Sequence, residues 1–440
     1  GRPESGGGAM MRWYRALPAL LWLLASAPAP AEAARRLTLP NDLRVVAQSS
    51  LSTDIVAIDL LLDASALDEP PDQAGVRYLV QRLLLRGTTH RSGDAMAREL
   101  AAVGGVMDTS VGLDYVEIYA LVPADGFDVA LTLLADAVQN PAFLPEEIAG
   151  QKVAARQAAQ AARDDPFQET YLAFREALYD GHPYARPTFG DARDLAALTR
   201  EDLTAFHAQH YRPNAATLAI CGGVGEARAT RAASEAFGDW ASGSLPFRRR
   251  PDAPLLTAST IAARELPVRR AHLILGFASP SVADPDYNAL PVIDSLLSGG
   301  ASSRLPQHLR EDLGLVYHVS SFYPTLSASS HFAIYAATAP HQLFAVKSAV
   351  LQALTRLIEE PVPPDELTHA KRYLLGSYAL SHQRMKDQAY ALAWYETLGL
   401  SGDFAEQYAA GVEAVTAADV KRAASATFTS FALAVAMPRE

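Results

Sequence analysis

Apolar residues recur along the chain at two spacings, and these spacings predict the order of its strands and helices. Alternating apolar positions flank the turn pair Asn41-Asp42, which predicts a β-hairpin over residues 36–50. Short apolar runs predict further strands over residues 53–64, 115–123, 214–224, 271–279, 331–340 and 431–438. Apolar positions three and four apart predict helices over residues 75–87, 93–103, 127–141, 145–166, 287–300, 303–312, 344–360 and 363–381.

The order of the expected elements is the same in the two halves of the chain. Each half opens with strands, continues with paired helices and closes on a strand. We therefore expect two homologous α+β domains, each an antiparallel-rich sheet with helices packed on one face. The proline-bounded segment 245–258 is the predicted linker between an N-terminal domain, residues 34–244, and a C-terminal domain, residues 259–440.

Charge and composition narrow the range of functions. The formal net charge of −11 at pH 7 argues against nucleic-acid binding, because no basic stripe could neutralise phosphates. Cys221 is the only cysteine, which excludes an internal disulfide and a multi-cysteine metal site. No apolar run after the N-terminal region has membrane length, so we expect no membrane span in the mature chain.

The N-terminal residues have the pattern of an export signal. Arg12 and Arg15 precede an apolar stretch, and the Ala-Glu-Ala at 31–33 has the small-x-small pattern of a cleavage site. We therefore interpret residues 10–33 as a signal peptide and residues 1–9 as upstream sequence, and we expect a periplasmic location.

The segment 74–88, AGVRYLVQRLLLRGT, is predicted to be an amphipathic helix with an unusual polar face. Tyr78 and Arg82 lie four positions apart, so their side chains stack on one face, with Gln81 beside them. An H-x-x-E-H zinc motif uses this geometry: two imidazoles bind the metal and the carboxylate activates a water. A phenol, an amide and a guanidinium cannot replace those groups, and the cationic guanidinium would repel the metal.

A longer stretch justifies the comparison with a zinc motif. Residues 181–224, GHPYARPTFGDARDLAALTREDLTAFHAQHYRPNAATLAICGGV, closely resemble the part of pitrilysin/insulinase-type zinc peptidases that contains H-P-Y-G-R-P, T-x-x-D-L and Y-x-P-x-N. The Arg-Gly-Thr at 86–88, the Gly-Gly at 104–105 and the Asp-Asp-Pro at 164–166 agree with the same family. The resemblance covers essentially the whole mature chain and points to the short bacterial branch, whose two-domain polypeptides form half of a four-domain clamshell.

The resemblance assigns five functional positions, and all five are substituted. Tyr78 and Arg82 stand for the two zinc histidines, Gln81 stands for the general base, Ala158 stands for the glutamate ligand and Gln151 stands for a supporting carboxylate. The substrate-strand motif of the family, N-A-x-T, is also altered, to the Asp-Thr-Ser-Val-Gly that begins at residue 108. We therefore expect no zinc and no other cofactor in this chain.

The same resemblance marks two residues that are retained. Arg310 and Tyr317 match an arginine and a tyrosine of the family's second domain. In active relatives these side chains reach the zinc site of the facing half and hold the substrate backbone and the oxyanion, a task that suits a guanidinium and a phenol. The structural alternative is a surface ion pair of Arg310 with Glu311 or Asp312, and a Tyr317 ring packed on a core.

Two hypotheses follow. In the first, the chain is the non-catalytic subunit of a heterodimeric periplasmic zinc metallopeptidase and is inactive alone. Arg310 and Tyr317 then act at the zinc site of a homologous partner that carries H-x-x-E-H, on peptide or unfolded-protein substrates. In the second, the chain is a catalytically inactive structural or peptide-binding homodimer of the same fold. The retained pair favours the first, and a neighbouring reading frame with an intact zinc motif would discriminate between them.

Overall fold

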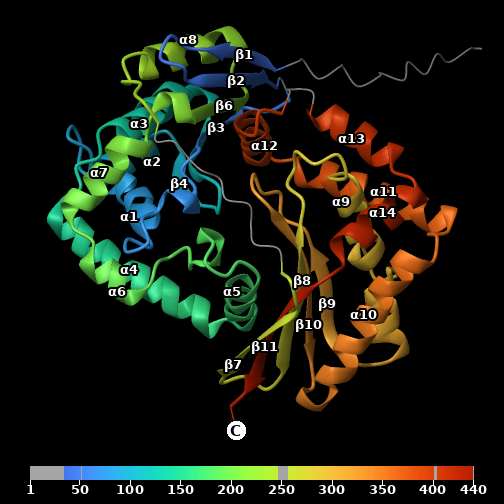
Figure 1. Ribbon diagram of the computed structural model, residues 1–440. Helices are drawn as coiled ribbons and strands as arrows, with labels where there is room; N and C mark the ends of the chain where they lie inside the picture. The colour runs from blue at the N-terminus through green and yellow to red at the C-terminus, as the bar shows by residue number, and fades with distance from the viewer. Residues whose placement is uncertain (1–33, 51, 246–255, 401–403, 440) are drawn as a thin grey trace, which may run out of the picture. The chain divides into compact units, whose positions relative to one another are not determined.

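The computed structural model describes residues 34–50, 52–245, 256–400 and 404–439, which form two β-sheets covered by helices (Figure 1). The predicted signal peptide, the residues before it and most of the predicted linker lie outside the described residues. From Ala34 onward the chain is one structural unit. Among the described residues, every helix is too short or too polar to span a bilayer.

Five strands of the first sheet follow the same order as the five strands of the second, and β1 is an additional edge strand, which confirms the duplicated α+β plan. The strands of the first sheet are β1 Arg35–Thr38, β2 Arg44–Ser49, β3 Ile55–Leu62, β4 Val106–Val111, β5 Val116–Pro123 and β6 Ala216–Gly222, in the order β1-β2-β6-β3-β5-β4. The strands of the second sheet are β7 Thr260–Leu266, β8 Ala271–Ser279, β9 Val316–Phe322, β10 Ser330–Thr338 and β11 Phe431–Pro438, in the order β7-β11-β8-β10-β9. The β2–β6 and β7–β11 pairs are parallel and the other pairs are antiparallel, so β4 and β9 are equivalent edge strands.

Both halves of the chain contain helices that follow and separate their strands. The first half contains α1 Val76–Leu83, α2 Gly93–Ala102, α3 Phe127–Gln139, α4 Pro145–Asp164, α5 Pro166–Leu178, α6 Ala192–Ala197, α7 Arg200–His210 and α8 Glu226–Phe237. The second half contains α9 Ala289–Ser298, the π-helix η6 Pro306–Asp312, α10 Leu343–Glu359, α11 Pro364–Ser381, α12 Met385–Thr397, α13 Phe404–Ala414 and α14 Ala417–Thr427. The short 3₁₀ turns are η1 Ala66–Asp68, η2 Leu84–Arg86, η3 Ala124–Gly126, η4 Pro183–Ala185, η5 Pro213–Ala215 and η7 Pro340–Gln342.

Equivalent helices begin with the same local chemistry. Thr199 before α7 and Thr416 before α14 each accept a hydrogen bond from the backbone N–H three residues later. Asp202 and Asp419 in turn accept from the backbone N–H of these threonines, at 2.7 and 2.8 Å. Each pair is a capping box that satisfies two N–H groups at a helix start.

Each sheet buries both of its faces, and the helix on the second face comes from the other half of the chain. The face of the first sheet formed by Ala57 and Leu61 is covered by α12, and α5 covers the second sheet along β7, β8 and β11 (Figure 1). The helices of each half therefore lie on one face of their own sheet, as the sequence indicates, and α5 and α12 are exchanged between the halves. Gly276 on β8 permits this exchange, because a Cβ there would lie 2.6 Å from the Phe174 ring of α5.

Several described elements differ from the sequence-based expectations. The strands β4, β7 and β9 and the helices α5 and α12 are among the elements that the apolar spacing does not predict. The predicted helix 303–312 is instead a π-helix over Pro306–Asp312, in which the Leu313 N–H donates to the His308 carbonyl at 3.1 Å.

Candidate functional site

The start of α1 is fixed by a close contact between two glycines. Gly75 precedes the helix with φ 92°, and a Cβ at this position would lie 2.8 Å from the Cα of Gly190. Only glycine combines this backbone angle with such a close approach. The contact holds the loop 187–190 against the N-terminus of α1, beside the positions that correspond to the zinc motif.

Gln81, at the position of the general base, is a structural amide. Its side chain is 0% exposed, its Nε2 donates to the Glu117 carbonyl at 2.5 Å, and its Oε1 accepts from the Tyr211 hydroxyl at 2.7 Å. Burial raises the pKa of Tyr211, so its hydroxyl remains a donor at neutral pH. With donor and acceptor both engaged, and with no titratable group, Gln81 cannot take a proton from water.

Tyr78 and Arg82, at the positions of the zinc histidines, are each engaged by a neighbouring segment. The Tyr78 ring packs edge-on against Phe189, with centroids 5.1 Å apart. The Arg82 Nη1 lies 3.1 Å from Oδ1 of Asp108 on the edge strand β4. Asp108 belongs to the altered substrate-strand motif, so two departures from the family pattern form one ion pair with each other.

The two remaining zinc-site positions lie on α4, which packs against α1. Gln151 is buried and Ala158, two helical turns further on, is half-buried. Neither supplies a carboxylate. Within the described ranges there is no group of three or more His, Cys, Asp or Glu side chains that could hold a metal ion. The donor set at the five positions does not fit zinc, because it offers no imidazole, thiolate or carboxylate.

Arg310 lies in the second half, on the π-helix next to β9. Its side chain is exposed and its Nε lies 2.8 Å from Oε1 of Glu311. This contact is the surface ion pair with Glu311 that the structural alternative expects for Arg310. The ion pair uses Nε of Arg310, and the side chain remains at the surface.

Tyr317 lies on the edge strand β9 at an irregularity in the register. His318 pairs with Ala337 and Val316 pairs with Thr338, so Tyr317 is the extra residue of a β-bulge. Its side chain is 57% exposed, which argues against a ring packed on a core. The guanidinium carbon of Arg270 lies 4.0 Å from the ring centre and holds the phenol from one side.

The structure thus separates the sequence-predicted residues into two groups. Tyr78, Gln81 and Arg82 lie on α1, close to the edge strand of the first sheet. Arg310 and Tyr317 lie at and beside the equivalent edge strand of the second sheet. Sequence reasoning did not single out Arg270, because nothing in the pair Arg269-Arg270 tells which arginine faces Tyr317.

The fold is that of a two-domain α+β protein, and the positions that the resemblance assigns to zinc binding carry other residues. Residues 44–192 match Insulinase (Peptidase family M16), and residues 197–374 match the Peptidase M16 inactive domain. The chain belongs to this family, as the resemblance of its motifs predicts.

Relatives and solved structures agree with that assignment. An uncharacterized zinc protease of Rickettsia felis is 28% identical over 352 residues, which are 79% of this chain and 83% of the relative. One from Mycobacterium tuberculosis is 29% identical over 361 residues, 80% of this chain and 81% of the relative. A protease from Helicobacter pylori has a similar structure, with a TM-score of 0.86, 20% identity, and coverage of 92% of this chain and 99% of that one. The peptidase M16 inactive domain from Pseudomonas fluorescens has a TM-score of 0.84, 22% identity, and coverage of 92% and 98%.

Proposed function

We propose that this protein is the non-catalytic subunit of a heterodimeric, periplasmic zinc metallopeptidase and is inactive alone. The observation that carries the proposal is the contrast between two groups of residues. At the zinc positions Gln81 is locked into the protein interior, and Arg82 is paired with Asp108. Arg310 and Tyr317, by contrast, present their side chains at the surface.

A homologous partner would supply the zinc ion, which polarises the scissile carbonyl, and the carboxylate of an intact H-x-x-E-H. The residues of this chain would then bind and orient the substrate. The Tyr317 hydroxyl would donate to the carbonyl oxygen as it becomes negative, and the terminal nitrogens of Arg310 would donate to a backbone carbonyl of the peptide. Arg270, stacked on the ring, would limit the motion of the phenol.

A second candidate is a catalytically inactive structural or peptide-binding homodimer. One observation favours it: the ion pair between Arg310 and Glu311 gives the guanidinium a partner within its own segment. Against it, the 57% exposure of Tyr317 excludes the structural role that this alternative gives the residue, a ring packed on a core.

The test is reconstitution with a homologous chain from the same genome that carries H-x-x-E-H. We expect the two chains to co-purify and to cleave a quenched fluorescent peptide faster than the partner alone. Tyr317→Phe or Arg310→Ala in the complex should lower kcat by about 10²-fold to 10³-fold, the range for loss of one oxyanion donor. Metal analysis of the isolated chain should find no stoichiometric zinc.

The matched controls are Tyr373→Phe and Arg372→Ala, two exposed neighbours on α11. Both should leave turnover unchanged. A mixture no more active than the partner alone, or unchanged turnover in the Tyr317 and Arg310 variants, would favour the inactive homodimer.

A further inference from the structure

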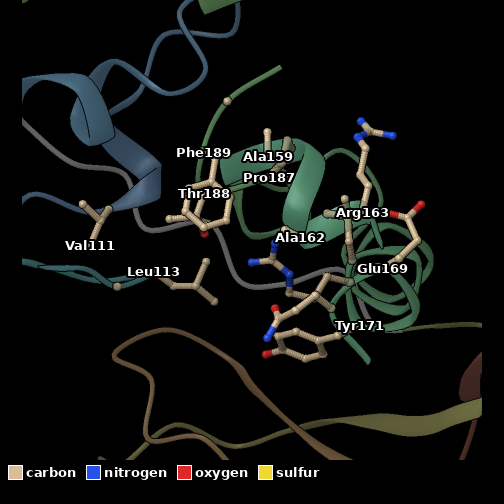
Figure 2. A pocket seen from close by; sticks show the side chains of 15 residues that line it. Val111, Leu113, Ala159, Ala162, Arg163, Glu169, Tyr171, Pro187, Thr188 and Phe189 are labelled. Atoms are coloured by element: carbon tan, nitrogen blue, oxygen red, sulfur yellow. The ribbon is translucent and has the colours of Figure 1, made fainter. Parts of the chain in front are cut away.

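A pocket of about 240 Å³ lies next to α1, on the side where Phe189 packs against Tyr78. Figure 2 shows it between the end of β4, the last turns of α4, the helix α5 and the loop 187–190. Its apolar lining consists of Val111, Leu113, Ala159, Ala162, Leu172, Pro187 and Phe189. None of the residues that carry the proposed function lines it.

One wall of this pocket contains a buried cation without a counter-ion. Arg175 of α5 is only 6% exposed, and its Nε has no hydrogen-bond partner in the described part of the chain. Its Nη2 donates to the Arg186 carbonyl at 3.1 Å, and the guanidinium lies over the Tyr171 ring at 5.3 Å. No carboxylate of the described residues forms an ion pair with it. Burial of an unpaired charge is costly, so such a group marks a place for an anion.

The neighbouring charges do not balance Arg175. Glu169 also lines the pocket, but its Oε1 lies 3.5 Å from Nε of Arg264. Glu176, the acidic neighbour of Arg175 in sequence, pairs with the same Arg264. Arg163 at the exposed rim adds a further positive charge. The net charge along the wall is therefore positive.

The size of the pocket limits the ligand to a small one. An apolar cavity of about 150 Å³ holds a benzene molecule, so about 240 Å³ accepts a group somewhat larger than benzene, such as one amino-acid residue with an apolar side chain. The apolar lining suits that side chain, and a guanidinium without an ion-pair partner suits a carboxylate.

We propose that this pocket binds the carboxylate of an apolar C-terminal residue of a peptide, with Arg175 as the carboxylate-binding residue. The proposal does not rest on the proposed function, because it concerns the isolated chain and requires neither a partner nor zinc. A carboxylate can also come from an acidic side chain within a peptide, and the choice of probes separates the two sources.

The first experiment uses the unmodified chain and three short peptides, with binding measured by calorimetry or by NMR titration. Acetyl-Ala-Leu should bind, and its C-terminal amide should bind roughly 10-fold to 100-fold more weakly, as expected for loss of a hydrogen-bonded charge. Acetyl-Asp-Leu amide, whose carboxylate is on a side chain, should bind as weakly as the first amide. The proposal is overturned if acetyl-Ala-Leu shows no saturable binding in the millimolar range, or if either amide binds as tightly as the free acid.

The second experiment compares three variants of the same chain. Arg175→Met removes the charge, and Ala162→Leu fills the pocket while leaving Arg175 in place. Both should weaken acetyl-Ala-Leu binding by roughly 10-fold or more. Arg163→Gln at the rim is the matched control and should change the affinity by less than about threefold, as expected for an exposed charge. Should Arg175→Met fail to fold, Ala162→Leu and the acid–amide comparison still decide. Equal losses in Arg163→Gln and Ala162→Leu would contradict the assignment.

Discussion

The hydroxyl of Tyr211 donates a hydrogen bond of 2.7 Å to Oε1 of Gln81, in a part of the core where both side chains are buried. Gln81 also contacts the first sheet, since its Nε2 donates to the carbonyl of Glu117 on β5. The amide thus joins α1, strand β5 of the first sheet and the segment after α7. At the position that the resemblance assigns to a catalytic base, the side chain therefore has a structural role.

Gln81→Glu tests this conclusion. A carboxylate at position 81 would place an oxygen against the Glu117 carbonyl, where the amide now donates, and would bury a negative charge. We expect the free energy of unfolding at pH 7 to fall by roughly 3 kcal/mol. Burial raises the pKa of the new carboxyl above its value in the unfolded chain, so the deficit should shrink as the pH falls toward 4 and the protonated acid donates again. Urea denaturation at both pH values measures it.

Gln157→Glu is the control for the change in chemistry alone. Gln157 lies exposed in the middle of α4. Its replacement should change stability by less than about 0.5 kcal/mol at either pH. Equal stability of Gln81→Glu and the wild type at pH 7 would contradict the assigned hydrogen bonds.

Much of the fold can be predicted from the local sequence pattern, because each half of the chain begins with strands and ends with a strand. The hairpin around Asn41-Asp42 and several helices, such as α1, α3 and α10, lie where apolar spacing indicates. The exchange of α5 and α12 could not be predicted, since it depends on contacts between halves rather than on periodicity. The helix α12 buries alanines such as Ala389 and Ala393 on the first sheet, and small residues give a weak amphipathic signal.

The sequence predicts which residues occupy the candidate site, but it does not predict their contacts. The sequence shows that Tyr78 and Arg82 stand where the resemblance expects zinc ligands, but it does not show the ion pair of Arg82 with Asp108, since this pair joins a helix to an edge strand. The same holds for Arg175, whose unpaired state depends on Arg264 taking both neighbouring acids. Such features arise from tertiary packing and have no sequence spacing.

The contact between Arg270 and Tyr317 makes a prediction for the reconstituted complex. A cation over an exposed aromatic ring contributes about 0.5–1 kcal/mol. Arg270→Gln should therefore lower kcat/KM by about 2-fold to 5-fold, because the phenol loses a contact that restricts its position. Steady-state kinetics with a quenched peptide measure this effect.

The adjacent Arg269 provides the matched control for that experiment, since it is also exposed and carries the same charge. Arg269→Gln should leave kcat/KM unchanged at moderate ionic strength. Equal losses in the two variants would mean that net charge, rather than contact with Tyr317, is responsible.

His331 on β10 joins the second sheet to α5 and should make stability fall in acid. Its Nδ1 and Nε2 lie 2.9 Å from the hydroxyls of Tyr179 and Tyr171. Burial lowers the pKa of His331 to about 3, so between pH 6.5 and about 3 the unfolded chain binds a proton that the folded chain does not. The free energy of unfolding should therefore drop as the pH falls below 6.5, by at most about 1.4 kcal/mol per pH unit.

The comparison that isolates this contribution is wild type against His331→Gln, unfolded with urea at pH 7 and pH 4.5. The wild type should lose about 2–3 kcal/mol more than the variant over this interval. His341→Gln, at an exposed histidine, should follow the wild type. Parallel losses in all three chains would contradict a buried neutral imidazole.

Asp59 on β3 should make the free energy of unfolding depend on pH in the opposite direction from His331. It is buried under α12, and burial together with the neighbouring Glu117 raises the pKa of Asp59 well above its usual value. The folded chain then holds a proton that the unfolded chain releases near pH 4, so stability is lost as the pH rises from about 4 toward the folded pKa. Asn carries no charge at any pH, and Asp59→Asn should gain stability relative to wild type between pH 4 and pH 8. The control Asp54→Asn, at an exposed aspartate, should not gain stability over this pH range.

If the wild type and Asp59→Asn show the same pH dependence in urea denaturation, Asp59 is ionised in the folded chain. The opposite result, together with the acid sensitivity of His331, places the maximum of these two contributions to stability between about pH 4 and pH 6.5, where their slopes have opposite signs.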